Sequence, residues 1–326
     1  MRMRPPILIA VLGCLAVLGL LVAVGFGSGS VGPRQVAALL AGGADPTAYQ
    51  VVVELRLPRA LAAFGTGAAL ALAGALMQVL LRNPLADPYI LGTSGGAAAF
   101  TLTAMLLGTT GFAVGASALA GALASTLLVF ALAHRGRWAP TRLLLTGVVV
   151  AAGWSALVSL LLAITPERNL RGALFWLMGD FAFAGNPTAC LLIAVSGTAA
   201  CFALGRSLNV LAAGDQQAAL LGLPVRAMRI GIYFLTALLT ATAVVTAGTV
   251  GFAGLVVPHL VRLLAGADHR AVVPGAALAG GTLLVLADTV ARTALAPRQL
   301  PVGAITALVG VPLFLFLLGR SQHGSS

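Results

Sequence analysis

Residues 57–81 read LPRALAAFGTGAALALAGALMQVLL, and no charged side chain lies between Arg59 and Arg82. About 20 apolar residues are enough for a helix to cross a bilayer, so this stretch predicts a membrane-spanning helix. The whole chain of 326 residues is 60% hydrophobic and 8% charged, with a mean hydropathy of +1.04. Soluble domains carry about 25% charged residues. The composition predicts a polytopic membrane protein and excludes a soluble enzyme, a nucleic-acid-binding module and a secreted disulfide scaffold.

Nine further apolar runs flank this one, so we expect an all-α membrane protein with about ten transmembrane helices. The runs are 7–27, 90–107, 113–133, 142–164, 187–205, 229–250, 252–264, 271–295 and 301–319. No long hydrophilic stretch remains for a soluble domain, so residues 1–326 are expected to form a single transmembrane domain. Gly and Pro interrupt two of the runs, at Gly92–Gly96 and around Gly248, Gly251 and Pro258. At membrane depth such residues indicate close helix contact or broken helices lining a cavity.

Every one of the 19 basic residues is Arg, and the net charge is +11. Without Lys the chain has no Walker-type nucleotide site and no Schiff-base chemistry. We attribute the charge to positive-inside topology and not to nucleic acid. Cys14, Cys190 and Cys201 lie in apolar runs and are interpreted as small hydrophobic residues.

A cytoplasmic N-terminus and ten spans place both termini in the cytoplasm, with twelve Arg on that side and seven outside. The seven are Arg34, Arg56, Arg59, Arg168, Arg171, Arg292 and Arg298. This is more outer Arg than the positive-inside rule leads one to expect, so these residues need a further role. None of the eight acidic residues falls at mid-bilayer, which argues against an autonomous ion-coupled transporter.

Three segments on the predicted cytoplasmic side, 82–92, 208–224 and 248–270, are rich in turn residues. Residues 82–92 carry two prolines four positions apart, and this segment alone is equally compatible with an ordinary turn between helices. Residues 208–224 are mostly apolar and contain no Arg, with Asp215 near the start of a short helix and Gly222 and Pro224 at its end. A membrane-surface helix would be rich in Arg, so docking into a groove of another protein explains 208–224 better. His259 is interpreted as a packed helix residue, and no metal site is expected.

Several motifs, taken in order from about residue 51 to 320, resemble the FecCD family of ABC importer permeases for iron-siderophores, haem and cobalamin. They are Arg56-Leu-Pro-Arg59, Ala73-Gly-Ala-Leu-Met-Gln78, Arg82-Asn-Pro-Leu-Ala-Asp-Pro88, Trp176-Leu-Met-Gly179, Leu208-Asn-Val-Leu211 with Gly222, Gly251-Phe-Ala-Gly-Leu-Val-Val-Pro-His259, Ala287-Asp-Thr-Val-Ala-Arg292 and Leu300-Pro-Val-Gly303. The resemblance implies a homodimer of ten-span subunits in the cell inner membrane, with two ATPase subunits below and one periplasmic or lipid-anchored substrate-binding protein above.

The resemblance also implies roles for particular residues. ATPase coupling would involve the 208–224 segment and its flank, at Leu208, Gly214, Asp215, Gln216, Gly222, Leu223, Pro224 and Arg226. Arg56, Arg59, Arg292 and Arg298 would dock the binding protein through its acidic residues, or else reach lipid headgroups. Asn83, Leu85, Pro140 and Thr141 would form the cytoplasmic gate. The chain departs from the family pattern at Gln299 and Asp215, where Glu is common, and at Asp180, where Ser is common.

Together these expectations describe a permease that is not itself an enzyme and binds no cofactor, since ATP-Mg would be hydrolysed on the partner ATPase. The cargo would be a ferric siderophore, haem or cobalamin, and the four histidines show no evident set of haem axial ligands. The alternatives are an autonomous secondary transporter or channel, which would follow an ion gradient, and an intramembrane enzyme, for which His259 has no nearby partner in sequence.

Overall fold

The computed structural model describes residues 3–27, 31–43, 45–134, 139–182 and 184–322, and these ranges contain helices but no strand. The helices are α1 (Pro5–Gly25), α2 (Pro33–Leu40), α3 (Pro46–Tyr49), η1 (Gln50–Arg56), α4 (Leu57–Leu81), η2 (Pro88–Leu91), α5 (Thr93–Leu106), α6 (Phe112–Ala133), α7 (Pro140–Ile164), α8 (Glu167–Met178), α9 (Thr188–Ala203), α10 (Gly205–Ala213), α11 (Asp215–Leu220), α12 (Val225–Ala247), α13 (Ala253–Ala265), α14 (His269–Thr293) and α15 (Val302–Gln322). Arg2, Arg135, Arg137 and His323 lie outside the described residues.

Each of the ten predicted apolar runs coincides with a helix, which confirms the all-α membrane fold. Six helical segments in the described ranges are long and apolar enough to cross a membrane. They are α1, the continuous helix Pro46–Leu81, α6, α7, α12 and α14. The pair α9 and α10, bent by 63°, would make a seventh, whereas α13 and the described part of α15 are shorter apolar helices.

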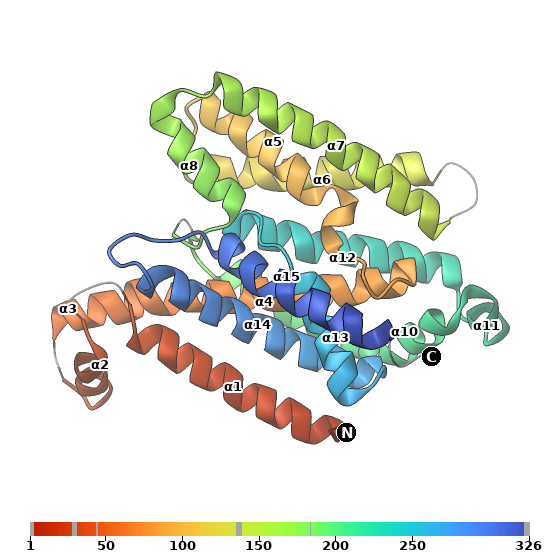
Figure 1. The fold of residues 1–326 in the computed structure, drawn as a ribbon, viewed down its shortest axis with the longest axis horizontal. Coiled ribbons are helices and arrows are strands. Elements are labelled where there is room, and N and C mark those ends of the chain that lie inside the picture. The colour runs from red at the N-terminus through yellow and green to blue at the C-terminus, as the bar shows by residue number, and fades with distance from the viewer. Residues whose placement is uncertain (1–2, 28–30, 44, 135–138, 183, 323–326) are drawn as a thin grey trace.

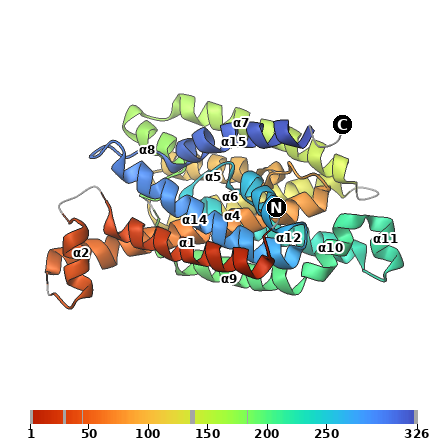
Figure 2. The ribbon, with the colours of Figure 1, turned by 60° about the horizontal axis from the view of Figure 1, so that its bottom comes forward.

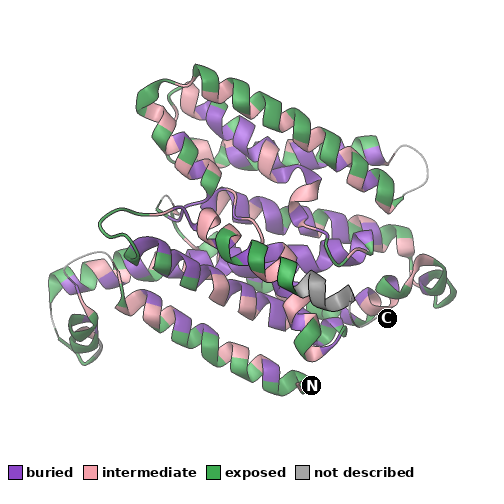
Figure 3. Cartoon of the chain, in the orientation of Figure 1, coloured by how far each residue is buried: buried purple, intermediate pink, exposed green. Residues whose placement is uncertain are grey.

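The helix α4 forms the centre of the molecule (Figure 1). It contacts α1, α9, α12, α13 and α14, and its residues are buried along almost the whole length (Figure 3). The sequence predicted that this helix begins at residue 57. Instead the helix continues back through η1 and α3 to Pro46. In η1 the turns widen to π-helical geometry, and the Leu57 N–H donates to the Val52 carbonyl. This wide turn precedes Pro58, which has no N–H to donate to a regular helix.

Small residues let the neighbouring helices approach the backbone of α4. A Cβ placed on Gly67 would overlap the carbonyl oxygen of Gly280 in α14, and one on Gly74 would overlap that of Gly254 in α13. Between apolar helices in a membrane, such close backbone approach is the main source of packing energy. The Gly- and Ala-rich sequence of residues 57–81 therefore determines how closely the bundle packs.

Both predicted irregular runs are breaks in the helical structure. Gly92 adopts a left-handed conformation, with φ of 69°, between η2 and α5. Residues 248–252 separate α12 from α13 and include Phe252, whose φ is 67°. This conformation is rare for a bulky side chain, so the surrounding contacts must hold this break in place.

The two ends of the molecule carry different features. At one end α1 begins and α15 ends, and the short helices α10 and α11 lie there as well (Figure 1). The opposite end carries α2 and α3, which project beyond α1 (Figure 2). Along the sides, α1 and α7 are largely exposed, as expected of helices that face lipid or another subunit (Figure 3).

We predict that Gly74→Ala lowers the free energy of unfolding by about 1–3 kcal/mol, the range for overpacking a close contact. The added methyl group would displace α13, because the atom it meets is a backbone oxygen. Thermal unfolding of the detergent-purified protein measures this change. The control is Gly13→Ala in α1, where a Cβ meets nothing within 4 Å, and equal midpoints for the two variants would contradict the packing role of Gly74.

Candidate functional site

A buried network of charged side chains lies at the beginning of α4. The Arg59 guanidinium donates to Asp288 of α14, with a Nη2–Oδ1 distance of 2.8 Å, and to Asp180 at 3.2 Å. Asp288 also pairs with Arg292 one turn further along α14, at 3.0 Å. Only 1% of the Asp288 side chain is exposed. Two cations and two carboxylates thus compensate each other and join α4, α14 and the segment after α8.

Arg56 and Arg292 also donate to main-chain carbonyl groups in and after α1. Arg56 donates to the carbonyl groups of Val24 and Gly25 at the end of α1, and to that of Val31 at 2.8 Å. Arg292 donates to Ala23 at 3.1 Å. Both guanidinium groups are buried. They therefore satisfy carbonyl groups that the end of a helix leaves without partners.

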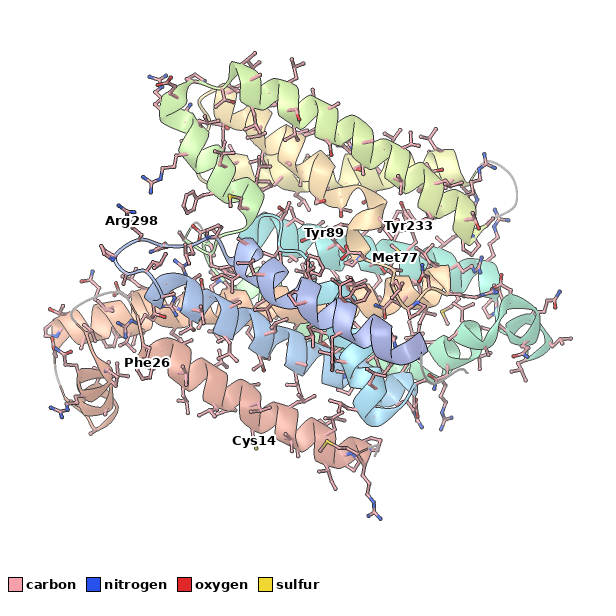
Figure 4. The ribbon with its side chains drawn as sticks, viewed as in Figure 1. Cys14, Phe26, Met77, Tyr89, Tyr233 and Arg298 are labelled. Carbon is pink, nitrogen blue, oxygen red and sulfur yellow. The ribbon has the colours of Figure 1, made fainter. Side chains whose placement is uncertain are left out.

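A cavity of about 780 Å³ opens beside this network. Arg56, Arg59 and Arg292 line it together with Glu54 and Gln299. Gln299, which stands where the family pattern has Glu, accepts a weak bond of 3.4 Å from Arg59. Arg298 is exposed on the α14–α15 loop, and Figure 4 shows its side chain extending away from the helices.

The four arginines expected to dock a binding protein therefore have two different environments. Arg56, Arg59 and Arg292 form bonds within the chain, although 14% of the Arg59 side chain stays exposed at the cavity. Arg298 is exposed, and its guanidinium group forms no hydrogen bond or ion pair within the described part of the chain. The sequence did not predict that Asp180 and Asp288 pair with Arg59, because this pairing depends on three segments meeting in space.

A second charged cluster lies at the other end of α4. Asp215, the first residue of α11, forms ion pairs with Arg82, which ends α4, and with Arg229 of α12. The Arg229 pair measures 2.8 Å, and Arg229 is buried. The segment 208–224 is thereby fixed to two of the long helices. Arg226, on the exposed side of α12, lies 3.3 Å from His134 Nε2.

The segment 208–224 forms two short helices where the sequence indicated a short helix beginning near Asp215 and ending before Gly222. Gly214, with φ of 133°, separates α10 from α11, and Gly222, with φ of 78°, follows α11. Leu208 is buried and anchors α10, whereas Gln216, Gly222 and Pro224 are exposed and Leu223 is partly buried. Leu220 and Leu221 are 87% and 72% exposed. Two adjacent exposed leucines on a polar end of the molecule indicate an interaction surface that motif matching did not single out.

The predicted gate segment 82–92 is held by bonds of its own side chains. The Asn83 carboxamide accepts the Leu85 N–H, and the Asp87 carboxylate accepts the Tyr89 N–H at 2.8 Å. Desolvation raises the pKa of Asp87 to about 6, and the bond from Tyr89 N–H opposes that rise. The Tyr89 hydroxyl donates to the Val250 carbonyl and accepts the Val250 N–H, at 3.2 and 3.1 Å. Tyr89, labelled in Figure 4, therefore joins this segment to the α12–α13 break.

The remaining gate residues lie at the surface. Leu85 is exposed, Thr141 is exposed at the start of α7, and Pro140 is partly buried. The segment η2 packs against α7, where a Cβ on Gly147 would overlap the Ile90 carbonyl oxygen. In the described ranges, no three His, Cys, Asp or Glu side chains come together to hold a metal ion.

Residues 15–320 match the FecCD transport family. The chain is 42% identical over 276 residues to the vitamin B12 import system permease protein BtuC of Citrobacter koseri, covering 83% of this chain and 84% of that protein. It is 40% identical over 292 residues to the uncharacterized ABC transporter permease protein YvrB of Bacillus subtilis, covering 87% and 82%.

Two solved structures are also similar. An inward-facing conformation of an ABC transporter assigned to the metal-chelate type superposes with a TM-score of 0.85 at 33% identity, covering 97% of this chain and 99% of that one. PsaBC from Streptococcus pneumoniae, solved in complex with Fab, gives a TM-score of 0.55 at 15% identity, covering 82% of this chain and 92% of that one, and supports the fold alone.

We predict that Asp288→Ala lowers the free energy of unfolding by about 3–5 kcal/mol, because it leaves buried guanidinium groups without their carboxylate. Thermal unfolding in detergent measures the loss. Glu54→Ala is the matched control, since Glu54 is an exposed carboxylate at the same end of the molecule and is expected to change stability by less than about 0.5 kcal/mol. If Asp288→Ala were as stable as this control, the network would not contribute to the fold.

Proposed function

The chain belongs to the FecCD transport family as an ABC transporter permease, and we propose that it imports cobalamin or an iron chelate across the cell inner membrane. In this proposal residues 1–326 form one multi-pass transmembrane domain. The chain binds no cofactor and catalyses no reaction itself. ATP-Mg is hydrolysed on two partner ATPase subunits, which agrees with a sequence that contains no Lys for a Walker-type site.

The observation that carries the proposal is the exposed helix α11 and its ion pairs to α4 and α12. Leu220 and Leu221 present apolar surface outward, and Asp215 connects the same helix to Arg82 and Arg229. A helix that docks by its apolar face into a groove of a partner needs such exposed anchors. The ion pairs give a physical route by which movement of a docked ATPase reaches the transmembrane helices. This end would then face the cytoplasm.

A substrate-binding protein would dock at the opposite end, around the cavity beside Arg59. Of the four arginines, Arg298 is exposed on the α14–α15 loop, and Arg59 is the network member that a carboxylate of a partner can approach from the cavity. Arg56 and Arg292 then support the rim by holding the end of α1, because their donors are used within the chain. Exposed charges of this kind mainly increase the rate of association and orient the partner.

A homodimer would complete the translocation path. The exposed sides of α7 and α15 supply apolar surface for a second copy, and the gate residues Leu85 and Thr141 are themselves exposed in one copy. The gate would therefore form between copies, with Asn83 shaping the turn that carries Leu85 and Pro140 starting α7.

Cobalamin is the cargo that the relatives support best, since a vitamin B12 import permease is 42% identical over 276 residues. A ferric siderophore or haem is the second candidate, supported by the similarity to a structure of the metal-chelate type. An autonomous secondary transporter or channel is the other class of function. The ion pairs described above lie at the two ends of α4 and not at mid-helix, which argues against a proton relay through the bundle.

We predict that Gly222→Leu prevents co-purification of the partner ATPase while the permease still elutes as a folded membrane protein. A side chain at a left-handed position costs about 1–2 kcal/mol and would redirect the turn that positions Leu220 and Leu221. The control is Gly231→Leu in α12, where a Cβ meets nothing within 4 Å and φ is not positive. Co-purification that Gly222→Leu leaves unchanged would show that α11 is not the docking helix.

Uptake into liposomes tests the function directly. The vesicles contain the permease with its ATPase, ATP inside and binding protein outside, and labelled cobalamin and a labelled ferric siderophore are tested in parallel. We expect ATP-dependent accumulation of cobalamin. Accumulation of only the siderophore would reassign the cargo, whereas uptake driven by a proton or sodium gradient without ATP would support the secondary transporter.

A further inference from the structure

A second cavity, of about 570 Å³, lies where α4, α10, α13 and the start of α14 meet. Its volume falls within the range of small-molecule sites, about 300–1,000 Å³. Its polar and charged lining residues are Gln78, Arg82, Asn209, Arg262, Asp268 and His269. Neither the transport proposal nor the coupling contacts use Gln78, Arg262 or His269.

Three buried side-chain atoms in this lining have no hydrogen-bond partner within the described residues. They are Gln78 Oε1, His269 Nε2 and Arg262 Nη2. Gln78 and His269 are each only 4% exposed. A buried polar atom without a partner costs about 1–3 kcal/mol, so three at one cavity indicate a group that is bound there.

The surrounding bonds determine which of these atoms donate and which accept. Asn209 Nδ2 donates to the Asp268 carboxylate at 2.8 Å, so its Oδ1 faces His269 and accepts from both the main-chain N–H and Nδ1, at 2.8 and 2.7 Å. Nδ1 therefore carries the proton. Burial and the Arg262 guanidinium group in the same lining disfavour a second proton on the ring, so His269 Nε2 is an acceptor.

Gln78 is oriented in the same way by a single bond. Its Nε2 donates to the Leu255 carbonyl at 3.2 Å, which leaves Oε1 as an acceptor. Arg262 Nη2 can only donate. The cavity thus offers two neutral acceptors and a cationic donor. Two further charged groups line it. Arg82 also pairs with Asp215, and the Asp268 carboxylate caps α14, where its Oδ1 accepts the Arg270 N–H.

We propose that this cavity binds a protonated phosphate group, either free dihydrogen phosphate or the protonated monoester headgroup of a phosphatidate lipid. Guanidinium groups bind the anionic oxygens, as Arg commonly does. Dihydrogen phosphate supplies one P–OH to Gln78 Oε1 and one to His269 Nε2, whereas a protonated monoester supplies its single P–OH to one of the two acceptors. A fully deprotonated oxyanion, such as sulfate or a phosphodiester, can pair with the guanidinium groups equally well. It has no hydrogen to donate, so the lone pairs of its oxygens would face those of Gln78 Oε1 and His269 Nε2. The acceptors therefore select for the protonated anion.

Equilibrium dialysis of labelled phosphate against the detergent-purified full-length chain at pH 6 tests this selection. At this pH inorganic phosphate is mostly the dihydrogen ion and phosphate monoesters are about half protonated, whereas sulfate carries no proton. We expect phosphate to bind and sulfate to compete at least about tenfold more weakly, because each unmet acceptor costs about 1–3 kcal/mol. Equal competition by sulfate, or no phosphate binding, would overturn the proposal.

Variants test the assignment of each group. Gln78→Leu is expected to bring the phosphate and sulfate affinities together, and Arg262→Gln to weaken both. Arg206→Gln is the matched control, because Arg206 is an exposed arginine of α10 outside the cavity lining, and it should change neither affinity. The wild-type comparison of phosphate with sulfate decides the question even if Gln78→Leu does not fold.

Lipid nanodiscs separate the two sources of the phosphate group. Phosphatidic acid that displaces labelled phosphate, when phosphatidylglycerol does not, would assign the site to a lipid headgroup. Phosphate that neither lipid displaces would assign it to the free ion. Displacement by phosphatidylglycerol as strong as that by phosphatidic acid would contradict the role of the P–OH donors.

Discussion

Close backbone contact around α4 is the constraint on which the rest of the structure depends. Gly67 and Gly74 allow α14 and α13 to approach until main-chain oxygens leave no space for a methyl group. Lipid is as apolar as these helices, so no hydrophobic force drives them together, and tight packing supplies the attraction. The charged networks at both ends of α4 depend on this packing, because they join side chains from helices that pack around it.

Sequence patterns predicted the fold class and the helix positions well. Apolar runs identify membrane helices by length alone, and the Gly and Pro clusters correctly marked the breaks before α5 and α13. The start of the central helix was missed, because η1 continues it through residues 50–56 that are less apolar and include Glu54. A π-helical turn is rare and has no periodic signal of its own in sequence.

The site residues were predictable only in part, since motifs give positions along the chain but not partners. The sequence predicted Asp215 as a coupling residue from its place before Gly222. It did not predict the ion pairs with Arg82 and Arg229, and Arg82 lies more than 100 residues away in the sequence. The partner of Asp288 could not be predicted either, because Asp288 and Arg59 are 229 positions apart in the sequence. The sequence also did not predict which side chains of this segment are exposed. Leu208 and Leu220 are both apolar, but Leu208 is buried and anchors the fold, whereas Leu220 faces outward.

The continuous helix Pro46–Leu81 has a consequence for how the two ends communicate. Its 36 residues extend about 54 Å, and ion pairs fix it at Arg59, within the helix, and at Arg82, directly after it. Thermodynamic linkage requires that coupled sites influence each other equally. If a partner bound near Arg82 alters affinity near Arg59 by some factor, a partner near Arg59 must alter affinity near Arg82 by that same factor. Coupling of binding along this helix would therefore be equally strong in both directions.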